Sequence, residues 1–253
     1  MKLKDERHQY ILDQIEQKRI ARVLDLSKDL NVAEMTIRRD LKELESQGYL
    51  QRIHGGAKAL SSPNPTIYKE QSRQDKKAMN TAAKKIIAQK CSTLIHDVVD
   101  DNEEVVFIGS GTTNEAIFDY IKEKRLTIVT NSMDIFMQYK GLAHIDTYLV
   151  GGRYREKTGT FVGQYAENMI RQFEITKAFI GANGIVNQEI TTANEAEGAC
   201  HQVVIETAEQ VYINADRTKF DVKALFTFAT LNQVTAVITD DVAKIEQNPM
   251  FFI

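Results

Sequence analysis

The sequence predicts an α/β protein in which an N-terminal winged helix-turn-helix is joined to a larger C-terminal α/β domain. Three short helical segments and one short strand follow one another within the first sixty residues. From residue 104 onward, short apolar runs alternate with helical segments, which is the pattern of a largely parallel sheet. Two of the three prolines lie between these parts. We therefore expect domains at residues 1–57 and 71–253 and a linker at 58–70.

Apolar spacing places the N-terminal helices. Residues 5–18 and 24–30 have apolar side chains at helical spacing, Asn31 breaks the pattern, and a third helix begins near Glu34. The buried stripe of that third helix is predicted to consist of Ile37, Leu41 and Leu44.

The third helix is expected to end at Gly48, where a C-terminal glycine belongs. Residues 49–53 alternate as a strand does, and Gly55-Gly56 is predicted to end it. Three helices and a strand of this size match a winged helix-turn-helix.

The outer face of the third helix is the candidate for contact with DNA. In helix-turn-helix proteins the N-terminal part of the second helix enters the major groove, where arginine binds guanine O6 and N7. The residues predicted to bind DNA are Thr36, Arg38, Arg39 and Lys42 on the helix, with Arg52 and His54 on the wing.

An ordinary surface helix would carry similar residues. Glu34 and Arg38 have the spacing of an i, i+4 ion pair, and Arg39 would then be one more solvated charge. Taken alone, two adjacent arginines favour this structural interpretation.

Charge is distributed unevenly along the chain. Residues 1–60 hold 12 basic and 10 acidic side chains, a net charge of +2, and the remainder holds 20 and 25, a net charge of −5. The overall net charge of −3 argues against a protein that coats nucleic acid over its whole surface. Only the N-terminal part is expected to meet phosphates.

Several classes of protein are not indicated. The N-terminus has no apolar run typical of a signal peptide, and no segment approaches the roughly 20 apolar residues of a membrane span, so we expect a cytoplasmic protein. Cys91 and Cys200 are far apart and predict buried thiols, with neither a disulfide framework nor a zinc site. We expect no metal and no cofactor.

The C-terminal domain is predicted to contain a buried sheet, preceded by an exposed, lysine-rich connecting helix at residues 71–95. Its strands are expected at residues 105–108, 127–129, 147–150, 178–180, 211–213 and 236–238.

The turn after the first of these strands is a candidate phosphate site. Gly109, Ser110, Gly111, Thr112 and Thr113 would bring backbone N–H groups and hydroxyls close to an anion at a helix start. The stretch lacks the spacing and the lysine of a nucleotide P-loop. A simple tight turn explains the glycines equally well.

Polar residues follow two more strands. Asn131 and Ser132 come after the second strand, and Gly152 and Arg155 come after the third. Ligands of open α/β sheets bind beyond the carboxyl ends of strands, so these loops are expected to converge on a polyhydroxylated, phosphorylated ligand.

The ordered motifs resemble the DeoR-type family of bacterial sugar-responsive repressors. The resemblance in the N-terminal part is carried by Thr36-Ile37-Arg38-Arg39-Asp40-Leu41, Leu44, Gly48 and His54-Gly55-Gly56-Ala57. One departure is Ala33, where the family has a serine after the turn, so the third helix lacks that N-cap unless Asn31 supplies one.

The resemblance covers nearly the whole chain and implies further site residues. The C-terminal half of such repressors is similar in fold to ribose-phosphate isomerases and amino-sugar-phosphate deaminases. It implies that the effector phosphate binds at 109–113 and the sugar at Asn131 and Ser132, and that Lys219 or Arg155 neutralises charge. The matching motifs also include Asn183, Glu197 and Asp216.

The resemblance also implies a partner and an effector. Residues 154–163 look most similar to repressors of lactose phosphotransferase operons, which respond to tagatose 6-phosphate. The family has Lys where this chain has His201, which leaves the ligand open. We expect a homo-oligomer, a dimer or a tetramer, that binds double-stranded operator DNA.

An enzyme is the competing interpretation. Isomerase or deaminase chemistry needs a carboxylate base beside a lysine or histidine. Glu195, Glu197, Asp216, Lys219 and His201 have suitable side chains, but they form no compact catalytic motif. A third possibility is a DNA-binding architectural module that ignores metabolites. We expect a regulator without catalytic residues.

Overall fold

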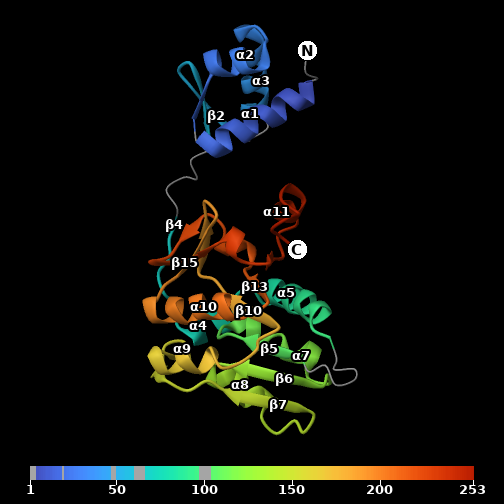
Figure 1. Ribbon diagram of the computed structural model, residues 1–253, viewed down its shortest axis with the longest axis vertical. Coiled ribbons are helices and arrows are strands. Elements are labelled where there is room, and N and C mark those ends of the chain that lie inside the picture. Colours follow the sequence, from blue (N-terminus) through green and yellow to red (C-terminus); the bar gives the residue numbers. More distant parts are fainter. Residues whose placement is uncertain (1–3, 19, 47–49, 60–65, 97–103) are drawn as a thin grey trace. The chain divides into compact units, whose positions relative to one another are not determined.

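The computed structural model describes residues 4–18, 20–46, 50–59, 66–96 and 104–253. The chain divides into two compact units, residues 1–64 and 65–253, and Figure 1 labels their elements. We call them the head and the sensor unit, and describe each by itself.

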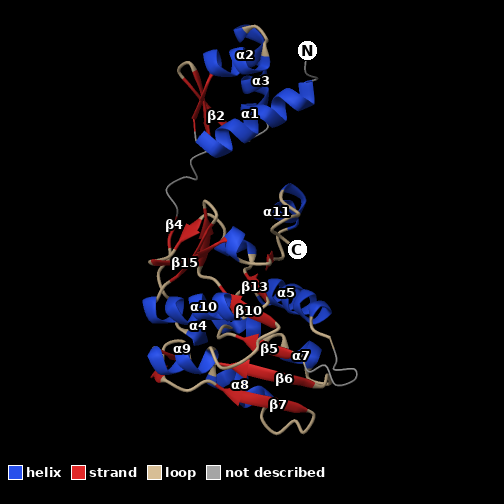
Figure 2. Ribbon diagram, in the orientation of Figure 1, coloured by secondary structure: helices blue, strands red, loops and turns tan. Residues whose placement is uncertain are grey.

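The head contains three helices and a small sheet among its described residues. Its elements are α1 (Lys4–Lys18), β1 (Ile20–Arg22), α2 (Val23–Leu30), α3 (Glu34–Ser46), β2 (Leu50–Ile53) and β3 (Gly56–Ala59). The three strands, which are red in Figure 2, form an antiparallel sheet. Their order is β1-β3-β2. Ile37, Leu41 and Leu44 are buried, as the spacing predicted, and pack with α1 and α2.

The wing differs from the single strand that the sequence predicted. Gly55 turns the chain with φ 78°, and Gly56 begins β3 instead of ending β2. A Cβ atom on Gly56 would lie 2.3 Å from the carbonyl oxygen of Ala21, so this close pairing requires glycine. The prediction missed β1 and β3 because neither has an alternating apolar pattern. Gly48 and Tyr49 lie outside the described residues.

Asn31 does not cap α3. It takes the left-handed conformation, φ 52°, at the C-terminal end of α2, and its N–H donates to the carbonyl of Lys28. The carbonyl of Ala33 accepts the first bond of α3, from the N–H of Thr36 at 2.9 Å. The shifted start considered for Asn31 is therefore wrong.

The sensor unit is built on a six-stranded parallel sheet. Its strands are β5 (Val105–Ile108), β6 (Leu126–Thr130), β7 (Ile145–Leu149), β10 (Lys177–Gly181), β13 (Gln210–Asn214) and β16 (Ala236–Ile238). All six predicted runs belong to this sheet, although β7 begins two residues early and ends at Leu149. The spatial order is β16-β13-β10-β5-β6-β7. The direction of winding therefore reverses between β5 and β10.

Helices cover both faces of this sheet. They are α4 (Arg73–Lys77), α5 (Thr81–Leu94), α6 (Thr112–Glu115), α7 (Phe118–Ile121), α8 (Met133–Tyr139), α9 (Gln164–Ile170), α10 (Glu195–Thr207) and α11 (Val242–Gln247), with 3₁₀ turns η1 (Arg217–Lys219) and η2 (Leu231–Gln233).

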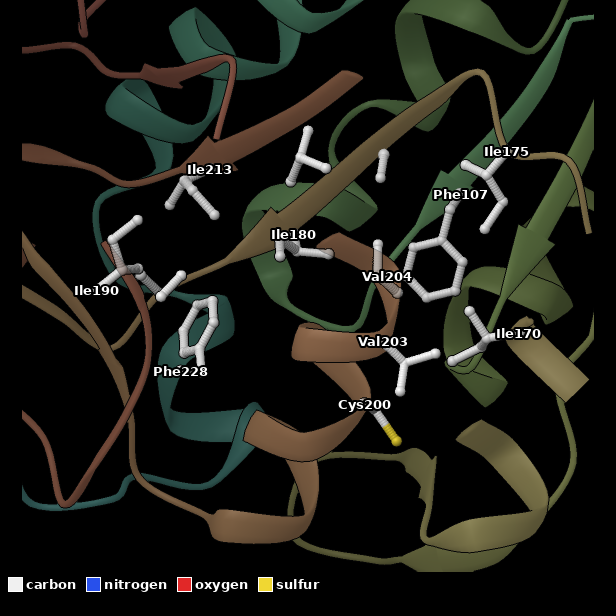
Figure 3. Packing of buried hydrophobic residues seen from close by; sticks show 14 of the residues in the cluster. Phe107, Ile170, Ile175, Ile180, Ile190, Cys200, Val203, Val204, Ile213 and Phe228 are labelled. Atoms are coloured by element: carbon white, nitrogen blue, oxygen red, sulfur yellow. The ribbon is translucent and has the colours of Figure 1, made fainter. Parts of the chain in front are cut away.

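Alternate strand residues face opposite sides of the sheet. Phe107, Ile180 and Ile213 face α9 and α10, and Figure 3 shows this cluster. Ile108 and Phe179 face the other side, where they pack with α5, α7 and α8. Each central strand is thus buried on both faces, which explains its continuous apolar sequence.

Short strands outside the parallel sheet were not predicted. They are β4 (Thr66–Ile67), β8 (Arg153–Arg155), β9 (Thr160–Val162), β11 (Gly184–Val186), β12 (Glu189–Thr192), β14 (Val222–Lys223) and β15 (Phe226–Thr230). They form a three-stranded sheet, β11-β12-β15, and the pairs β14-β4 and β8-β9.

The predicted linker and connecting helix both need correction. The described part of 58–70 contains the end of β3 and all of β4, which pairs with β14. The predicted helix at 71–95 is two helices, α4 and α5, separated where Asn80 has φ 52°. Nor is α5 simply exposed, since Ile87, Ala88 and Cys91 are buried against the sheet.

Both cysteines are free and buried, as predicted. Among the described residues, no helix combines the length and the apolar character of a bilayer span.

Candidate functional site

The outer face of α3 is exposed and basic. Arg38, Arg39 and Lys42 are exposed, Thr36 is half-buried at the side, and Met35 completes the outer face. This arrangement follows from the helix period, because the inward stripe leaves these positions about 100–180° away.

The Glu34–Arg38 ion pair expected of an ordinary surface helix is present. Arg38 Nη2 lies 3.4 Å from Glu34 Oε2, and the two side chains are 53% and 44% exposed. An exposed i, i+4 pair contributes only about 0.3–0.5 kcal/mol, so it holds Arg38 weakly. Arg39 makes no ion pair with any residue that the structure describes. The pair therefore leaves both guanidinium groups available to a ligand.

Asp40 of the Thr-Ile-Arg-Arg-Asp-Leu motif has a structural role. Its carboxylate is buried and accepts from Arg7 of α1, Nε to Oδ2 at 2.9 Å and Nη2 to Oδ1 at 3.2 Å. His8 Nε2 lies 3.4 Å from the same carboxylate. This pair, which the sequence interpretation missed, joins the buried side of α3 to α1.

The wing residues are exposed as well. Arg52 Nε lies 3.0 Å from Glu45 Oε2, and the Arg52 backbone N–H also donates to Glu45. His54 lies at the exposed turn before Gly55. The six predicted DNA-binding residues thus all lie on α3 or the wing, and five of them are exposed.

The sensor unit contains a cavity at the carboxyl ends of its three adjacent strands β5, β10 and β13. About 110 Å³ is open there to the centres of water-sized molecules, several times the roughly 10–15 Å³ that one water needs. The cavity lies where the sheet reverses its winding, the usual ligand position in open α/β sheets.

The cavity brings eight of the thirteen predicted effector residues together. These are Ser110, Gly111, Thr112, Thr113, Asn183, Glu197, Asp216 and Lys219. They come from three strand ends, α10 and η1. Of the three loops predicted to converge, only the one after β5 lines this space.

The other five lie outside the lining. Gly109 lies behind the loop. A Cβ atom on Gly109 would lie 3.1 Å from Cγ2 of Ile180. Asn131 donates to the Phe161 carbonyl at 3.1 Å, and Ser132 caps α8 by accepting from the Ile135 N–H at 3.4 Å. These two tie β6 to β9 and α8 instead of facing the cavity.

Gly152 and Arg155 have structural surroundings. A Cβ atom on Gly152, at φ 155°, would lie 2.9 Å from the Val162 carbonyl oxygen. Arg155 lies behind the cavity wall, where Nη1 donates to Glu197 at 3.2 Å and Nη2 to Glu70 Oε2 at 2.7 Å. The strand-end argument located β6 and β7 correctly, but both lie on the side of β5 away from β10 and β13, whose ends line the cavity.

The sequence interpretation missed three cations of the lining, Arg73, Lys76 and Lys84. Lys84 is 7% exposed, its Nζ donates to the Lys76 carbonyl, and burial lowers its pKa. Arg73 Nε and Nη2 donate to Glu115 at 2.6 and 2.7 Å. Arg73 and Lys76 lie on α4 and Lys84 lies on α5, on the two sides of the break at Asn80.

Asp216 and Lys219 form the η1 side of the cavity. Asp216 Oδ1 accepts from the Thr218 N–H at 2.9 Å and from Asn80 Nδ2 at 3.3 Å, and Lys219 Nζ lies 3.5 Å from Oδ2. Burial alone would raise the pKa of Asp216, but Lys219 and these hydrogen bonds outweigh it and lower the pKa. Asp216 is therefore a carboxylate that caps η1.

Arg217 of η1 binds Asp240 and does not line the cavity. Its backbone N–H donates to Asp240 at 2.8 Å and its Nε at 2.7 Å, outside the cavity lining.

Asn114 holds the loop after β5 in place. Its Nδ2 donates to the carbonyls of Gly109 and Phe179, at 2.8 and 3.1 Å, and its Oδ1 accepts from Asn214 at 2.8 Å. This buried network joins β5, β10 and β13, and both asparagines also line the cavity.

The α10 side of the cavity is polar but carries no cation. Glu197 accepts from Thr158 and Arg155, and Asn183 Oδ1 accepts from the Ala193 N–H at 2.9 Å. His201, one turn beyond Glu197, also lines the cavity. The side chains that line the cavity include four cations and two carboxylates, Glu197 and Asp216. The lining therefore has a net charge of +2, which suits an anion.

Family models match both units. The DeoR-like helix-turn-helix domain matches residues 7–63, and the DeoR C terminal sensor domain matches residues 79–241.

Whole-chain relatives are repressors. The lactose phosphotransferase system repressor of Staphylococcus aureus (strain NCTC 8325 / PS 47) is 34% identical over 247 residues, 96% of this chain and 95% of that protein. The repressor of the same name from Lactococcus lactis subsp. lactis is 35% identical over 221 residues, 86% and 84% of the two chains.

Solved structures resemble part of the chain. Ribose 5 phosphate isomerase A from Neisseria gonorrhoeae matches with a TM-score of 0.39 and 16% identity over 56% of this chain and 54% of that one. The Pyrococcus horikoshii OT3 translation initiation factor eIF-2B matches with a TM-score of 0.42 and 14% identity, over 61% of each chain.

The motifs predicted a transcriptional regulator, and the whole-chain relatives are named as repressors. The two family models and the length of these matches account for both the head and the sensor unit. The chain therefore belongs to the DeoR family, as a transcriptional regulator with a DNA-binding helix-turn-helix domain and a sensor domain.

Proposed function

We propose that the protein represses a sugar-utilisation operon in the cytoplasm, and that a phosphorylated sugar bound in the cavity controls its binding to operator DNA. The observation that carries this proposal is the cationic cavity at the winding reversal of the sensor sheet, in a chain that also has an exposed basic recognition helix.

The head supports sequence-specific binding to DNA. Arg38 and Arg39 extend from the first turns of α3, which is where recognition helices meet base edges. Lys42, Arg52 and His54 flank them, and phosphate contacts are their expected role. Thr36 lies beside the first turn, within reach of a phosphate or a thymine methyl group.

The cavity supports a phosphate at one end and a sugar at the other. Backbone N–H groups of Ser110 to Thr113 and the ammonium groups of Lys84 and Lys219 suit a phosphate dianion. Asn183 makes no hydrogen bond with its Nδ2 group to any described residue, so this group remains for a sugar hydroxyl. A phosphorylated sugar satisfies both ends at once.

Tagatose 6-phosphate is our first candidate for the effector. The relatives at 34% and 35% identity are named lactose phosphotransferase system repressors, and the cavity chemistry fits a ketohexose phosphate. The chain is also proposed to act as a homo-oligomer, because two linked heads on a two-fold operator raise occupancy through effective concentration.

The first described segment of the sensor unit, residues 66–77, is proposed as a route for the signal. Glu70 lies between β4 and α4, and Arg155 joins it to Glu197 of the cavity wall. Gln71, Arg73 and Lys76 then line the cavity themselves. An effector that prefers one arrangement of this segment would shift the population of head positions.

A ligand screen tests the effector. Purified protein is heated with tagatose 6-phosphate, other sugar phosphates, their unphosphorylated sugars and inorganic phosphate, because a ligand of the folded form raises the transition temperature. We expect a shift with a phosphorylated sugar and none with its free sugar. Replacing Thr112 and Thr113 by valine should remove that shift.

Operator binding is then measured on a duplex that the protein selects from a random library. We expect the active sugar phosphate to change its affinity for this duplex, and the Thr112→Val, Thr113→Val variant to bind the duplex without this response. Selection of no preferred sequence would contradict the repressor, and a preferred sequence with no response to any sugar phosphate would contradict the effector alone.

A further inference from the structure

His201 is a buried polar side chain that the protein itself leaves unpartnered. It is 7% exposed, lines the cavity from α10, and its ring packs edge-on against Phe228 at 4.8 Å between centroids. Its Nδ1 atom is sealed from water and has no hydrogen-bond partner among the described residues. Most buried polar groups in proteins are paired, so a hydrogen bond within the protein does not account for this ring, and the nitrogen that is not sealed is the one open to a ligand.

The two ring nitrogens have different surroundings. Only Nδ1 is both sealed and unpartnered, so Nε2 is the nitrogen that opens to the cavity. A buried N–H without an acceptor is rarer in proteins than an unused acceptor. The favoured tautomer therefore has its lone pair on Nδ1 and its proton on Nε2, which makes Nε2 a donor toward the cavity.

The imidazole is neutral near pH 7. Burial lowers the pKa of His201 to about 4, and no neighbouring charge contributes to that shift. Lys84, by contrast, lies close enough to Asp216, Lys219 and Lys76 for all three to affect its pKa. His201 lines the cavity from α10, whereas Lys84 lines it from α5 and Lys219 from η1.

We propose that His201 donates a hydrogen bond from Nε2 to an uncharged oxygen of the effector, a hydroxyl or carbonyl of the sugar, and so selects the sugar instead of the phosphate. Glu197 lies four residues earlier on the same face of α10, and Asn183 lines the same cavity. His201, Glu197 and Asn183 would bind the sugar. Lys84 and Lys219 would bind the phosphate. This inference rests on the proposed function of the cavity.

Calorimetric titration of the full chain at pH 7.5 tests the assignment. The probes are tagatose 6-phosphate, fructose 6-phosphate and inorganic phosphate. His201→Leu removes the donor and still fills the apolar space beside Phe228. We expect its affinity for the preferred sugar phosphate to fall about tenfold, with its affinity for inorganic phosphate within twofold of the parent.

Two further variants decide what such a loss means. His201→Gln keeps an N–H donor and should recover sugar-phosphate affinity to within about threefold of the parent. His144→Leu is the matched control, because His144 is exposed, bonds to the Lys122 carbonyl at 2.7 Å and lies outside the cavity lining. It should bind all three probes as the parent does.

Each remaining outcome counts against a defined claim. If the parent binds a sugar phosphate and His201→Leu binds it equally well, the role of His201 is wrong and the effector site stands. Equal losses for the sugar phosphate and for inorganic phosphate also overturn the role in selecting the sugar. If the parent binds inorganic phosphate but neither sugar phosphate, both the ketohexose effector and this role fail together.

Discussion

In the proposed function, Arg39 contributes more than any other side chain to recognition of the DNA sequence. It is exposed in the second turn of α3 and has no ion-pair partner within the described part of the chain, whereas Arg38 shares its charge with Glu34. Arg39→Ala should therefore weaken binding to the selected duplex by about 1–3 kcal/mol and relax the preference at one base pair, if it binds a guanine.

Fluorescence anisotropy against the selected duplex and its single-base variants measures both effects. Arg171→Ala is the matched control, since Arg171 is an exposed arginine of the sensor unit that pairs with Glu206 at 2.7 Å. The control should bind like the parent. Unchanged affinity and unchanged base preference in Arg39→Ala would remove this residue from the interface.

His201 gives a pH prediction at the same scale. Its pKa is about 4 when folded and 6.5 ordinarily, so the unfolded chain binds the extra proton between these values. Its contribution to stability is complete above about pH 6.5 and is lost as pH falls toward 4. The shift corresponds to about 3 kcal/mol.

Urea unfolding of parent and His201→Gln at pH 7 and pH 4.5 tests this sign. Other titrating groups act in both proteins, so the difference between them isolates His201. We expect the parent to lose more stability than the variant on acidification. An equal loss would mean that the imidazole is not neutral and buried in solution.

At the scale of elements, the orientation of α3 depends on one buried ion pair to α1. Removing one partner leaves the other charge buried and unpaired, which typically costs about 3–5 kcal/mol, whereas replacing both with apolar residues is often neutral. Arg7→Met should therefore destabilise the head strongly, and Arg7→Met with Asp40→Leu should restore most of the loss.

Hydrogen exchange of α3 peptides in the full chain measures the local opening free energy. Lys4→Met is the control, because Lys4 forms a more exposed pair with Glu43 between the same two helices. It should change protection little. A double variant as unstable as Arg7→Met would show that Asp40 has a role besides its pairing with Arg7.

Elements differ in how far the sequence predicts them. Strands of the parallel sheet are buried on both faces, so their apolar runs are continuous and all six were predicted. Strands such as β3 and β14 are only two to four residues long and are defined by their partners, for example Gly56 against Arg22. No local pattern identifies a strand of that kind.

The candidate site was also predictable only in part. Loops after β5, β10 and β13 carry recognisable polar motifs, and they do line the cavity. Lys84 was not predicted, because a lysine on an amphipathic helix normally faces water and only the turn at Asn80 buries it. Asn131 was misplaced because its strand, β6, lies on the side of β5 away from β10, and its side chain bonds to the Phe161 carbonyl, which no local pattern predicts.

At the scale of the whole molecule, the segment that leads from the head forms part of the cavity wall. Glu70 in this segment is not itself a lining residue. Burial would raise its pKa, but hydrogen bonds from Arg155 and Lys157 outweigh burial and lower it, so Glu70 is ionised. Arg155 also pairs with Glu197, so in the proposed mechanism the signal would pass from the cavity wall through Arg155 to Glu70.

Glu70→Gln is therefore expected to uncouple the two sites without destroying either. The amide keeps the shape of the side chain but weakens its charge-assisted bonds to Arg155. Sugar-phosphate affinity in the absence of DNA should stay within about threefold of the parent, while the effect of the sugar phosphate on operator affinity should fall from a typical 5–150-fold coupling toward none.

Linkage requires that the coupling be the same in both directions, so it is measured twice. One titration determines operator affinity with and without the sugar phosphate, and the other determines sugar-phosphate affinity with and without the operator duplex. Glu206→Gln is the control, because it removes an exposed ion pair from α10 that does not involve the segment before α4. Parent and control should each give the same coupling factor in both titrations. Glu70→Gln should give no coupling, a factor of about 1, in both.

A Glu70→Gln variant with full coupling would exclude the route through Glu70, Arg155 and Glu197. The contacts of Arg73 and Lys76 with the cavity would then have to carry the signal.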